Sequence, residues 1–204
     1  MTTTPPGYRV RARHERFTGS VFRVVTDEVE MPDGSVADRD YVVHIGAVGV
    51  VAVDDDNRIV LIRQYRPALG TELWELPAGL VDVAGEALPA AAARELAEEA
   101  DLTAREWDLL ADVHTSPGCS TELIRLYLAR GLAEVPDAHR HTRTHEEAGL
   151  AVHRVPLDKA LEMIFSGEIT NASCLVGVLA AARVAAAGRP AFRPLDAPLP
   201  TRAR

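Results

Sequence analysis

The chain has 204 residues, of which 47% are hydrophobic and 25% are charged, the composition of an ordinary globular protein. Its formal net charge is −8, which argues against a protein that binds nucleic acid, because phosphate backbones are held by an excess of lysine and arginine. An acidic protein can still bind a small phosphorylated ligand if bound divalent cations make the charge of the binding site locally positive.

Three features of the sequence bear on its compartment. Cys119 and Cys174 form neither a disulfide framework nor a zinc-ligand pattern, which fits a reducing cytoplasm. Residues 1–7 are polar and proline-rich, without the apolar core of a signal peptide. The longest apolar runs, such as residues 46–53, fall far short of the roughly 18 residues that a membrane span needs. We therefore expect a cytoplasmic protein without membrane association.

Strand-like patterns come first along the chain, in short segments separated by turn residues. These segments are residues 21–26, 28–30, 41–45, 47–53, 58–64 and 72–77. The segment 47–53 is almost wholly apolar, and the polar turn 54–57 joins it to residues 58–64. We expect these two segments to form a hairpin whose first arm is buried on both faces.

A helical repeat follows at residues 86–100, where Leu88, Ala92, Leu96 and Ala100 recur every four residues. The other expected elements are strands at 107–113, 123–129 and 148–155 and helices at 157–166 and 171–187, the last begun by an Asn171 cap. Strands, one helix, more strands and then helices predict an α+β fold or a mixed-sheet sandwich rather than a regular βαβ series.

Three carboxylates share one face of the expected helix, because Glu95, Glu98 and Glu99 stand at positions i, i+3 and i+4. Such a run is most often a solvated surface stripe. Two costs oppose that interpretation here. Like charges at this spacing repel by roughly 0.2–0.5 kcal/mol per pair, and the helix dipole disfavours acids in the last turns. Oxygen ligands at short spacing are what Mg²⁺ or Mn²⁺ requires, so we favour a metal site.

Arg94 lies among these acids and can pair with Glu86, two turns earlier, or with Glu98. A guanidinium can bridge two carboxylates rigidly, so we expect Arg94 to clamp the loop 79–85 against the helix. The glycines at the two ends of this loop would supply unusual backbone angles. The loop would then hold the carbonyl of Ala78 near the acids as a further metal ligand.

These residues match the pattern of a known family. Gly79, Glu86 and the run 94–102 closely resemble the Nudix box, a loop–helix–loop motif. The chain departs from the usual box in two places: one additional residue separates Gly79 from Glu86, and Asp101 replaces a glycine after the acids. The spacing from Glu86 to Glu99 is that of the box.

The resemblance implies an α/β/α Nudix sandwich, in which a mixed sheet lies between helices. It also implies attack by water on a nucleoside diphosphate linked to a variable group, with Mg²⁺, or Mn²⁺, as the cofactor. Carried over position by position, the resemblance implies Glu95 and Glu99 as the main metal ligands, with Glu98 assisting. It also implies that the Ala78 carbonyl completes the shell and that Glu86 and Arg94 are the orienting pair.

Outside the box, residues 73–79 and the turn 116–118 resemble the ADP-ribose pyrophosphatases of that family, and the likeness covers most of residues 17–190. This resemblance implies ADP-ribose or a related ADP-sugar as substrate, and AMP and ribose 5-phosphate as products. In relatives the N-terminal strands form a small antiparallel domain exchanged between two subunits, which implies a homodimer. The expected parts are an N-terminal dimerisation domain at 1–45, the Nudix domain at 46–190 and a proline-rich extended tail at 191–204.

The resemblance also implies residues that contact the substrate. Arg66 would hold a diphosphate oxygen. The equally weighted alternative is that Arg66 is only a surface residue of its strand. Arg39 would approach the adenine from the partner subunit, where a guanidinium stacks well on a base. Phe22 would stack likewise, although a strand phenylalanine is more often core. The Pro117-Gly118 turn would line the site, and Glu122 would accept hydroxyls of the terminal ribose.

A general base must come from outside the box, because the box acids are committed to metal. Residues 136–147 form the long polar connection after the box, with Glu146 and Glu147 at its end. In related pyrophosphatases a glutamate from this region closes over the diphosphate. We favour Glu147 as the base, because it lies nearer the next strand, over Glu146 and over two solvated acids. The same loop carries histidines without cysteines, which we interpret as loop residues rather than zinc ligands: His139, His141 and His145.

Two other functions stay open. A hydrolase of GDP-sugars or other nucleoside-diphosphate derivatives shares much of this architecture and is the nearest competing enzyme. A non-catalytic Nudix-fold sensor of ADP-ribose would be expected to lose the box acids and to carry a DNA-binding domain. This chain keeps the acids and has an acidic net charge, so the enzyme is the favoured interpretation.

Overall fold

The structure, a computed structural model, describes residues 7–143 and 149–200. None of the helices in these residues is long and apolar enough to cross a membrane. The chain divides into two compact units. The described part of the first is residues 7–46, 114–123 and 198–200, and that of the second is residues 47–113, 124–143 and 149–197.

The first unit is built on a three-stranded antiparallel sheet of β1 (Arg9–Thr18), β2 (Phe22–Glu30) and β3 (Val36–His44), with β2 in the centre. The antiparallel N-terminal sheet expected from the sequence is therefore present. The sequence pattern did not indicate β1, because this strand is rich in arginine and almost wholly exposed, and so lacks an alternation of apolar and polar residues.

A polar network joins the three strands of this sheet. The Arg13 guanidinium donates two hydrogen bonds to the buried Asp27 carboxylate, at 2.7 and 2.9 Å, and the Tyr41 hydroxyl donates a third at 2.6 Å. The bonds from Arg13 hold the pKa of Asp27 below its ordinary value. Burial, with the bond to Asp27, raises the pKa of Tyr41 to about 12. Because one residue comes from each strand, the network fixes their pairing.

The second unit contains the remaining strands and all three α-helices of the described residues. In chain order they are β4 (Ala47–Ala52), β5 (Arg58–Arg66), β6 (Thr71–Glu75), β7 (Ala78–Leu80), α1 (Leu88–Ala100), β8 (Leu102–His114), β9 (Leu123–Glu134), the 3₁₀ turn Asp137–His139, β10 (Ala151–Pro156), α2 (Leu157–Phe165) and α3 (Ala172–Ala187). The predicted cap of the last helix is confirmed, because the Asn171 side chain accepts a hydrogen bond from the Cys174 N–H at 3.0 Å.

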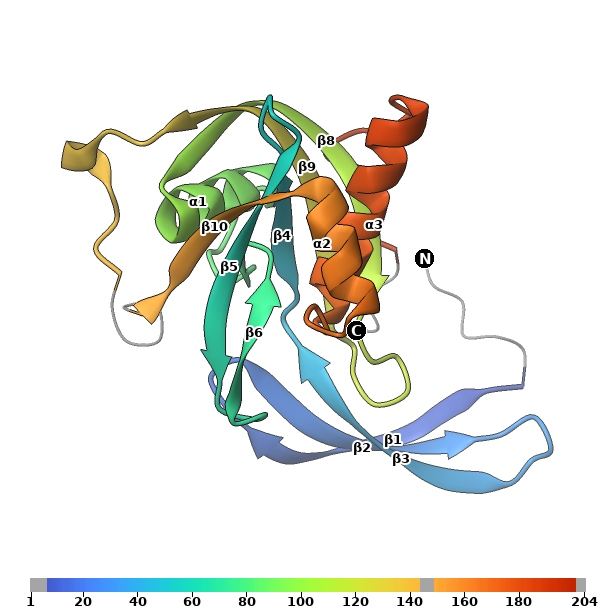
Figure 1. Cartoon of the computed structure of the whole chain (residues 1–204). Coiled ribbons are helices and arrows are strands. Elements are labelled where there is room, and N and C mark those ends of the chain that lie inside the picture. The colour runs from blue at the N-terminus through green and yellow to red at the C-terminus, as the bar shows by residue number, and fades with distance from the viewer. Residues whose placement is uncertain (1–6, 144–148, 201–204) are drawn as a thin grey trace. The chain divides into compact units, whose positions relative to one another are not determined.

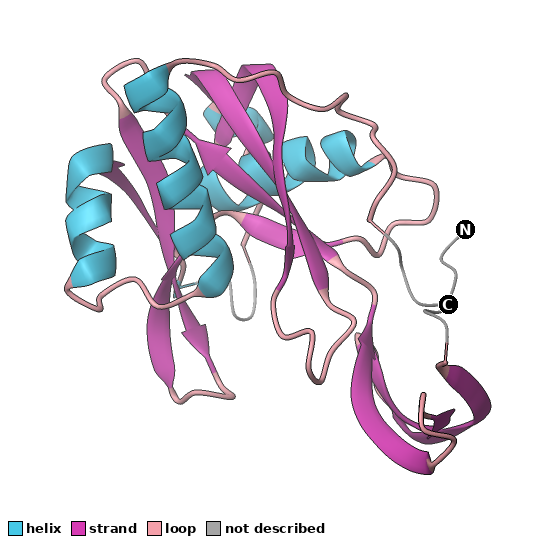
Figure 2. Cartoon of the chain, turned by 90° about the vertical axis from the view of Figure 1, so that its right-hand side faces the viewer, coloured by secondary structure: helices cyan, strands magenta, loops and turns pink. Residues whose placement is uncertain are grey.

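These strands form two sheets. One is mixed and has the order β7-β4-β9-β8, with β4 parallel to β9 and antiparallel to β7. The other is antiparallel, with the order β10-β5-β6. In this unit α1 lies on one side of the strands and α2 and α3 on the other (Figure 1). The side view shows the same arrangement, with helices flanking the strands (Figure 2).

Two apolar clusters follow from these layers. One joins α1, through Ala92 and Leu96, to β4 residues such as Val50. The other joins α2 and α3 to the opposite face of β4, represented by Val51. Cys174 belongs to this second cluster, and burial raises the pKa of its thiol to about 12, so it serves packing. Both cysteines are free, as expected.

The predicted hairpin of residues 47–53 and 58–64 is wrong. The turn between them is present, with Asn57 N–H bonded to the Asp54 carbonyl at 3.0 Å. Beyond an isolated bridge between Val53 and Ile59, however, β4 and β5 enter different sheets. The reason is that both edges of β4 are already paired, with β7 and β9, so that β5 has no edge to join. The prediction of a β4 buried on both faces is confirmed.

Residues 191–197 belong to the second unit and contain a turn, in which the Ala197 N–H donates to the Pro194 carbonyl at 3.0 Å. Arg125, on β9, donates to the Ala197 carbonyl at 2.6 Å, and Tyr127 donates to the Leu195 carbonyl at 3.2 Å. Arg193 bonds Asp112 on β8 at 2.8 Å. Asp112 also accepts two bonds from Arg125, at 2.7 and 3.0 Å, which makes a buried ion pair. This segment therefore acts as a structural strap.

Replacing Asp112 by Asn should test how much the strap and the sheet depend on this ion pair. The side chains of Arg125 and Asp112 are 1% and 5% exposed. Removing one charge of such a pair leaves the other buried without compensation, which costs about 3–5 kcal/mol. We expect a loss of that size in the free energy of unfolding, measured with a chemical denaturant. Asp56→Asn, which removes an exposed pair with Arg58, is the control and should cost less than about 1 kcal/mol.

The same pair predicts the pH dependence of stability. Although burial opposes ionisation, hydrogen bonds from Arg125 and Arg193 hold the pKa of Asp112 below its ordinary value. A lowered pKa in the folded state gives stability that is complete above the unfolded value of about 3.9 and is lost as the pH falls below it. The difference in the free energy of unfolding between wild type and Asp112→Asn should therefore be constant near neutral pH. It should become smaller below about pH 4. A constant difference down to pH 3 would contradict this account.

Candidate functional site

The acidic end of α1 packs against β7 within the second unit. Glu95 and Glu99 are both buried there, at 6% and 3% exposure. The Ala78 N–H donates to Glu99 Oε2 at 2.8 Å. A Cβ atom on Gly79 would lie 2.1 Å from the Glu95 carboxyl carbon, closer than any real contact. The main chain of β7 therefore supports both carboxylates at close range.

This packing corrects the expected role of Gly79. Its backbone does not adopt a positive φ, so conformational freedom is not the reason for glycine at this position. Space is the reason, because the Glu95 carboxylate occupies the place of a side chain. Gly85, at the other end of the loop, does have a positive φ of 80°, as predicted.

Arg94 clamps the loop and the helix together, as predicted. Its Nε and Nη2 donate to both oxygens of Glu86, at 3.1 and 3.0 Å. Its Nη1 donates to Glu95 at 2.6 Å and to Glu98 at 3.1 Å. The bonds from Arg94 lower the pKa of Glu86, and the same bonds, with the charge of Glu95, raise the pKa of Arg94. Glu86 and Arg94 are therefore both ionised near neutral pH.

The donor set suits a hard divalent cation. Counted formally, the four acids contribute −4 and Arg94 contributes +1, a sum of −3. The acids are Glu86, Glu95, Glu98 and Glu99. Within residues 7–143 and 149–200, no three acidic, histidine or cysteine side chains come together as a ready-made metal cluster. The reason is visible in the contacts, because Arg94 Nη1 bonds both Glu95 and Glu98, while Glu99 accepts from Ala78. The Ala78 carbonyl as a ligand stays a prediction.

The C-terminal end of α1 is fixed by a second set of charges. Asp101 adopts the left-handed conformation, with a φ of 55°, where the usual Nudix box has glycine. Its carboxylate accepts from Arg143 at 2.6 Å, and Arg143 Nε donates to the Glu98 carbonyl at 3.0 Å. Asp101 is also 4.0 Å from Arg140. The start of the polar loop is thereby attached to the turn that carries Glu98.

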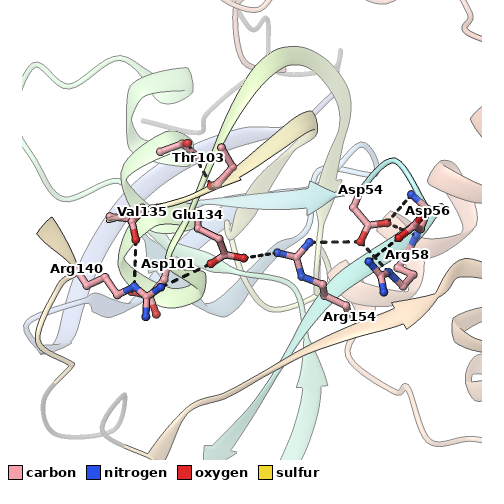
Figure 3. A network of polar contacts seen from close by, with 10 residues as sticks. Asp54, Asp56, Arg58, Asp101, Thr103, Glu134, Val135, Arg140 and Arg154 are labelled. Carbon is pink, nitrogen blue, oxygen red and sulfur yellow. Dashed lines mark hydrogen bonds and ion pairs between the residues drawn. The ribbon is translucent and has the colours of Figure 1, made fainter. Parts of the chain in front are cut away.

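These contacts continue into an extended network (Figure 3). Arg140 Nε donates to the Val135 carbonyl, and its guanidinium lies 3.8 Å from Glu134 at the end of β9. Arg154 on β10 bonds Glu134 at 2.7 Å and Asp54 at 3.4 Å. Figure 3 shows these charges in one line from the end of α1 to the β4–β5 turn. The network joins the helix end to four other segments of the unit, namely the polar loop, the end of β9, β10 and the β4–β5 turn.

A pocket of about 580 Å³ opens beside this end of α1. Arg94, Ala97 and Glu98 line it on the helix side, and His139, Arg140, His141 and Thr142 line it from the loop. Sequence reasoning treated the two histidines as loop residues only, since nothing in their spacing indicates which element they approach. Their position beside Glu98 makes them candidates for contact with a ligand of the acidic site.

The expected substrate residue of the second unit, Arg66, forms a bidentate ion pair. Its guanidinium bonds both oxygens of the buried Glu75, at 2.8 and 2.6 Å. The pair links β5 to β6 and fixes the orientation of the guanidinium. A contact of Arg66 with a diphosphate stays a prediction.

The other expected substrate residues belong to the first unit. Arg39 and Phe22 are exposed on β3 and β2, and Phe22 lies 6.1 Å from the ring of Phe17. The alternative of a core phenylalanine is therefore excluded for Phe22, which is 40% exposed. The Pro117-Gly118 turn is exposed as well, and Glu122 follows it. Their contacts with substrate stay predictions. Glu146, Glu147 and His145 lie outside the described residues.

Comparisons with known proteins agree with this architecture. A family model described as NUDIX domain matches residues 43–173. An ADP-ribose pyrophosphatase of Mycobacterium tuberculosis is 46% identical over 181 residues, 88% of this chain and 84% of that protein. A methanol dehydrogenase activator of Bacillus methanolicus is 35% identical over 162 residues, 79% of this chain and 85% of that protein. The crystal structure of an ADP compounds hydrolase matches with a TM-score of 0.76 at 19% identity, covering 93% of this chain and 100% of that chain, which confirms the fold.

Gly79→Ala tests whether close packing of β7 on Glu95 is needed. The added methyl group would overlap the Glu95 carboxylate, so either that side chain or β7 must move. We expect a variant that folds, with a somewhat lower melting temperature, and turnover reduced by about 10²-fold or more, because ångström-scale misplacement of positioned groups has effects of that size. Turnover within a few-fold of wild type would contradict the role assigned to this contact.

Proposed function

The chain belongs to the Nudix family, and on that premise we propose that it hydrolyses the pyrophosphate bond of ADP-ribose, or of a related ADP-sugar, to AMP and the sugar phosphate. The observation that carries the class of reaction is the pair of buried carboxylates, Glu95 and Glu99, held against β7. The choice of ADP-ribose is supported by the Mycobacterium tuberculosis relative, which matches 88% of this chain.

Mg²⁺, or Mn²⁺, is the cofactor of this proposal. Glu95 and Glu99 would be its main ligands, with Glu98 and the Ala78 carbonyl as additional oxygen donors. When bound, a divalent cation polarises phosphoryl oxygens and lowers the pKa of a bound water. The chain's own contribution is to orient these carboxylates, and Arg94 does so by bonding Glu95 and Glu98 while it is held by Glu86.

A substrate panel tests the proposal directly. ADP-ribose, an ADP-hexose, a GDP-sugar and a deoxynucleoside triphosphate would be compared by kcat/KM with Mg²⁺ present, with products separated by chromatography. We expect the highest kcat/KM for ADP-ribose, products AMP and ribose 5-phosphate, and no turnover after chelation of the metal. A higher value for the GDP-sugar would establish the competing enzyme, and binding of ADP-ribose without turnover would establish a sensor.

The general base of this proposal is Glu147, with Glu146 as the alternative. The support comes from the sequence, because these acids end the polar loop that follows β9 and the box acids are engaged at α1. Glu147→Gln should lower kcat by about 10²–10⁴-fold with KM nearly unchanged, the usual range for general base catalysis. Glu146→Gln is the matched control. A loss in that control alone would move the role to Glu146, and less than tenfold loss in both would place the base elsewhere.

A homodimer belongs to the same proposal. The first unit exposes several large apolar side chains, a feature of protein contact surfaces: Val10, Phe17, Phe22 and Val36. Sedimentation should show a dimer at micromolar concentration, and deletion of residues 1–45 should remove both dimerisation and activity. A wild-type monomer that is fully active at nanomolar concentration would contradict shared active sites.

A further inference from the structure

The polar loop of residues 136–143 has little apolar packing to hold it in place. Residues 136–142 are all exposed, and within this loop only Arg143 is partly buried. The ion pair between Arg140 and Asp137, at 3.2 Å, lies inside the loop and does not attach it to another element. In the part of the chain that the structure describes, the hydrogen bonds from this loop to α1 and its C-terminal cap are both made by Arg143. The position of the loop beside α1 therefore depends mainly on this arginine.

Arg143 contacts the last turn of α1 and the residue that follows it. Its Nη2 donates to Asp101 Oδ2 at 2.6 Å, and its Nε donates to the Glu98 carbonyl at 3.0 Å. Carbonyls in the last turn of a helix lack a partner within the helix, and a cation is favoured beside them. Asp101 and Arg143 are each 21% exposed, so salt screens this ion pair less than a pair on the open surface. Two bonds from one guanidinium thus hold residue 143 against the helix.

Asp101 is an unfavourable residue for its own position. Its φ of 55° has no steric penalty for glycine but has one for aspartate. Its negative charge also stands at the C-terminus of α1, where the helix dipole disfavours an acid. Glycine, the residue of the usual Nudix box, would avoid both costs. Residues kept in spite of such costs cluster where function needs them, so the carboxylate of Asp101 requires an explanation.

The Asp101–Arg143 pair adjoins both parts of the candidate site. Glu98, three residues before Asp101, lines the pocket of about 580 Å³ whose other side is formed by the loop. The acids proposed as general base, Glu146 and Glu147, lie outside the described residues, but they follow Arg143 by three and four residues in the sequence. An extended chain covers at most about 3.6 Å per residue, so the position of Arg143 limits how far these acids can lie from α1.

We propose that Asp101 is a positioning residue for the reaction, which holds the loop at the required distance from the acids of α1 through its ion pair with Arg143. Asp101 itself contacts neither metal nor substrate in this proposal. The inference deepens the proposed function and rests on it, because the rate that it concerns is that of the hydrolysis. It gives a physical reason for an aspartate at a position where this chain departs from the usual Nudix box.

Three variants separate the ion pair from the backbone conformation. Asp101→Gly removes the carboxylate and fits the positive φ without strain. Asp101→Asn tolerates the same φ and keeps an oxygen that can accept from Arg143. Arg143→Ala removes the guanidinium, and it is also combined with Asp101→Gly. The matched control, Asp137→Asn, removes an ion pair of the same loop that does not reach α1. Each variant is compared with wild type by kcat and KM with Mg²⁺ present, by calorimetric affinity for Mn²⁺, and by melting temperature.

Asp101→Gly and Arg143→Ala should each lower kcat about tenfold or more, because ångström-scale misplacement of positioned groups costs up to about 10²-fold. KM and the affinity for Mn²⁺ should stay within about threefold of wild type, and the melting temperature within about 4 °C, the shift expected for a partly exposed ion pair. Asp101→Asn should recover most of the lost kcat. The combined variant should be about as slow as Arg143→Ala, because both changes remove the same contact. The control should have the kcat of wild type.

A kcat of Asp101→Gly equal to that of wild type overturns the inference. A loss of kcat that accompanies an equal loss of affinity for Mn²⁺ also overturns it, because Asp101 would then act on the metal site. So does an equally slow Asp137→Asn, because any charge of the loop would then matter. Losses that multiply in the combined variant show that the two residues act separately, which contradicts the inference as well.

These outcomes are distinct from a failure of the proposed function. Kinetics are measured with the substrate of the panel that the wild type hydrolyses fastest, so a different nucleotide sugar corrects the proposed function while the variants still decide the inference. If the wild type hydrolyses its substrate and Asp101→Gly behaves like wild type, the inference alone is wrong. If the wild type hydrolyses no substrate of the panel, the proposed function is wrong and the positioning role is overturned with it.

Discussion

The structure of the second unit depends on the burial of two carboxylates of α1, Glu95 and Glu99. Burying like charges is unfavourable unless each is compensated by an opposite charge or a hydrogen bond. Here Arg94 bonds Glu95, together with the less buried Glu86 and Glu98. The Ala78 N–H bonds Glu99, and Gly79 leaves room for Glu95. One arginine does not neutralise the formal charge of four carboxylates. This excess of negative charge is the physical reason to expect a divalent cation beside these acids.

The rest of the second unit keeps this end of α1 in position. The apolar side of α1 packs on β4, whose edges are paired with β7 and β9. The strand that supports the acids, β7, therefore belongs to the same sheet as the strand on which the helix packs. At the helix end, Asp101 and Arg143 attach the start of the polar loop. The fold thus positions the acids from β7, from the core and from the loop, which is the arrangement that precise catalysis requires.

The sequence was sufficient for the acidic face, because positions i, i+3 and i+4 of one helix determine it locally. The spacing also allowed Arg94 to pair with Glu86 or with Glu98, and the structure shows both contacts. It was not sufficient where partners are distant in sequence. The hairpin prediction failed because the pairing of β4 depends on β7 and β9, and the role of Gly79 depends on Glu95, which belongs to another element.

The central claim is that Glu95 and Glu99 form a divalent metal site, and a calorimetric titration with Mn²⁺ of wild type and Glu99→Gln tests it most directly. The amide oxygen of glutamine can still accept from the Ala78 N–H, so the substitution removes the charge and keeps the contact that supports the fold. We expect saturable binding to wild type, binding weakened at least about tenfold in the variant, and an unchanged or slightly higher melting temperature, since like-charge repulsion is relieved. Equal binding of Mn²⁺ by both proteins would contradict the account.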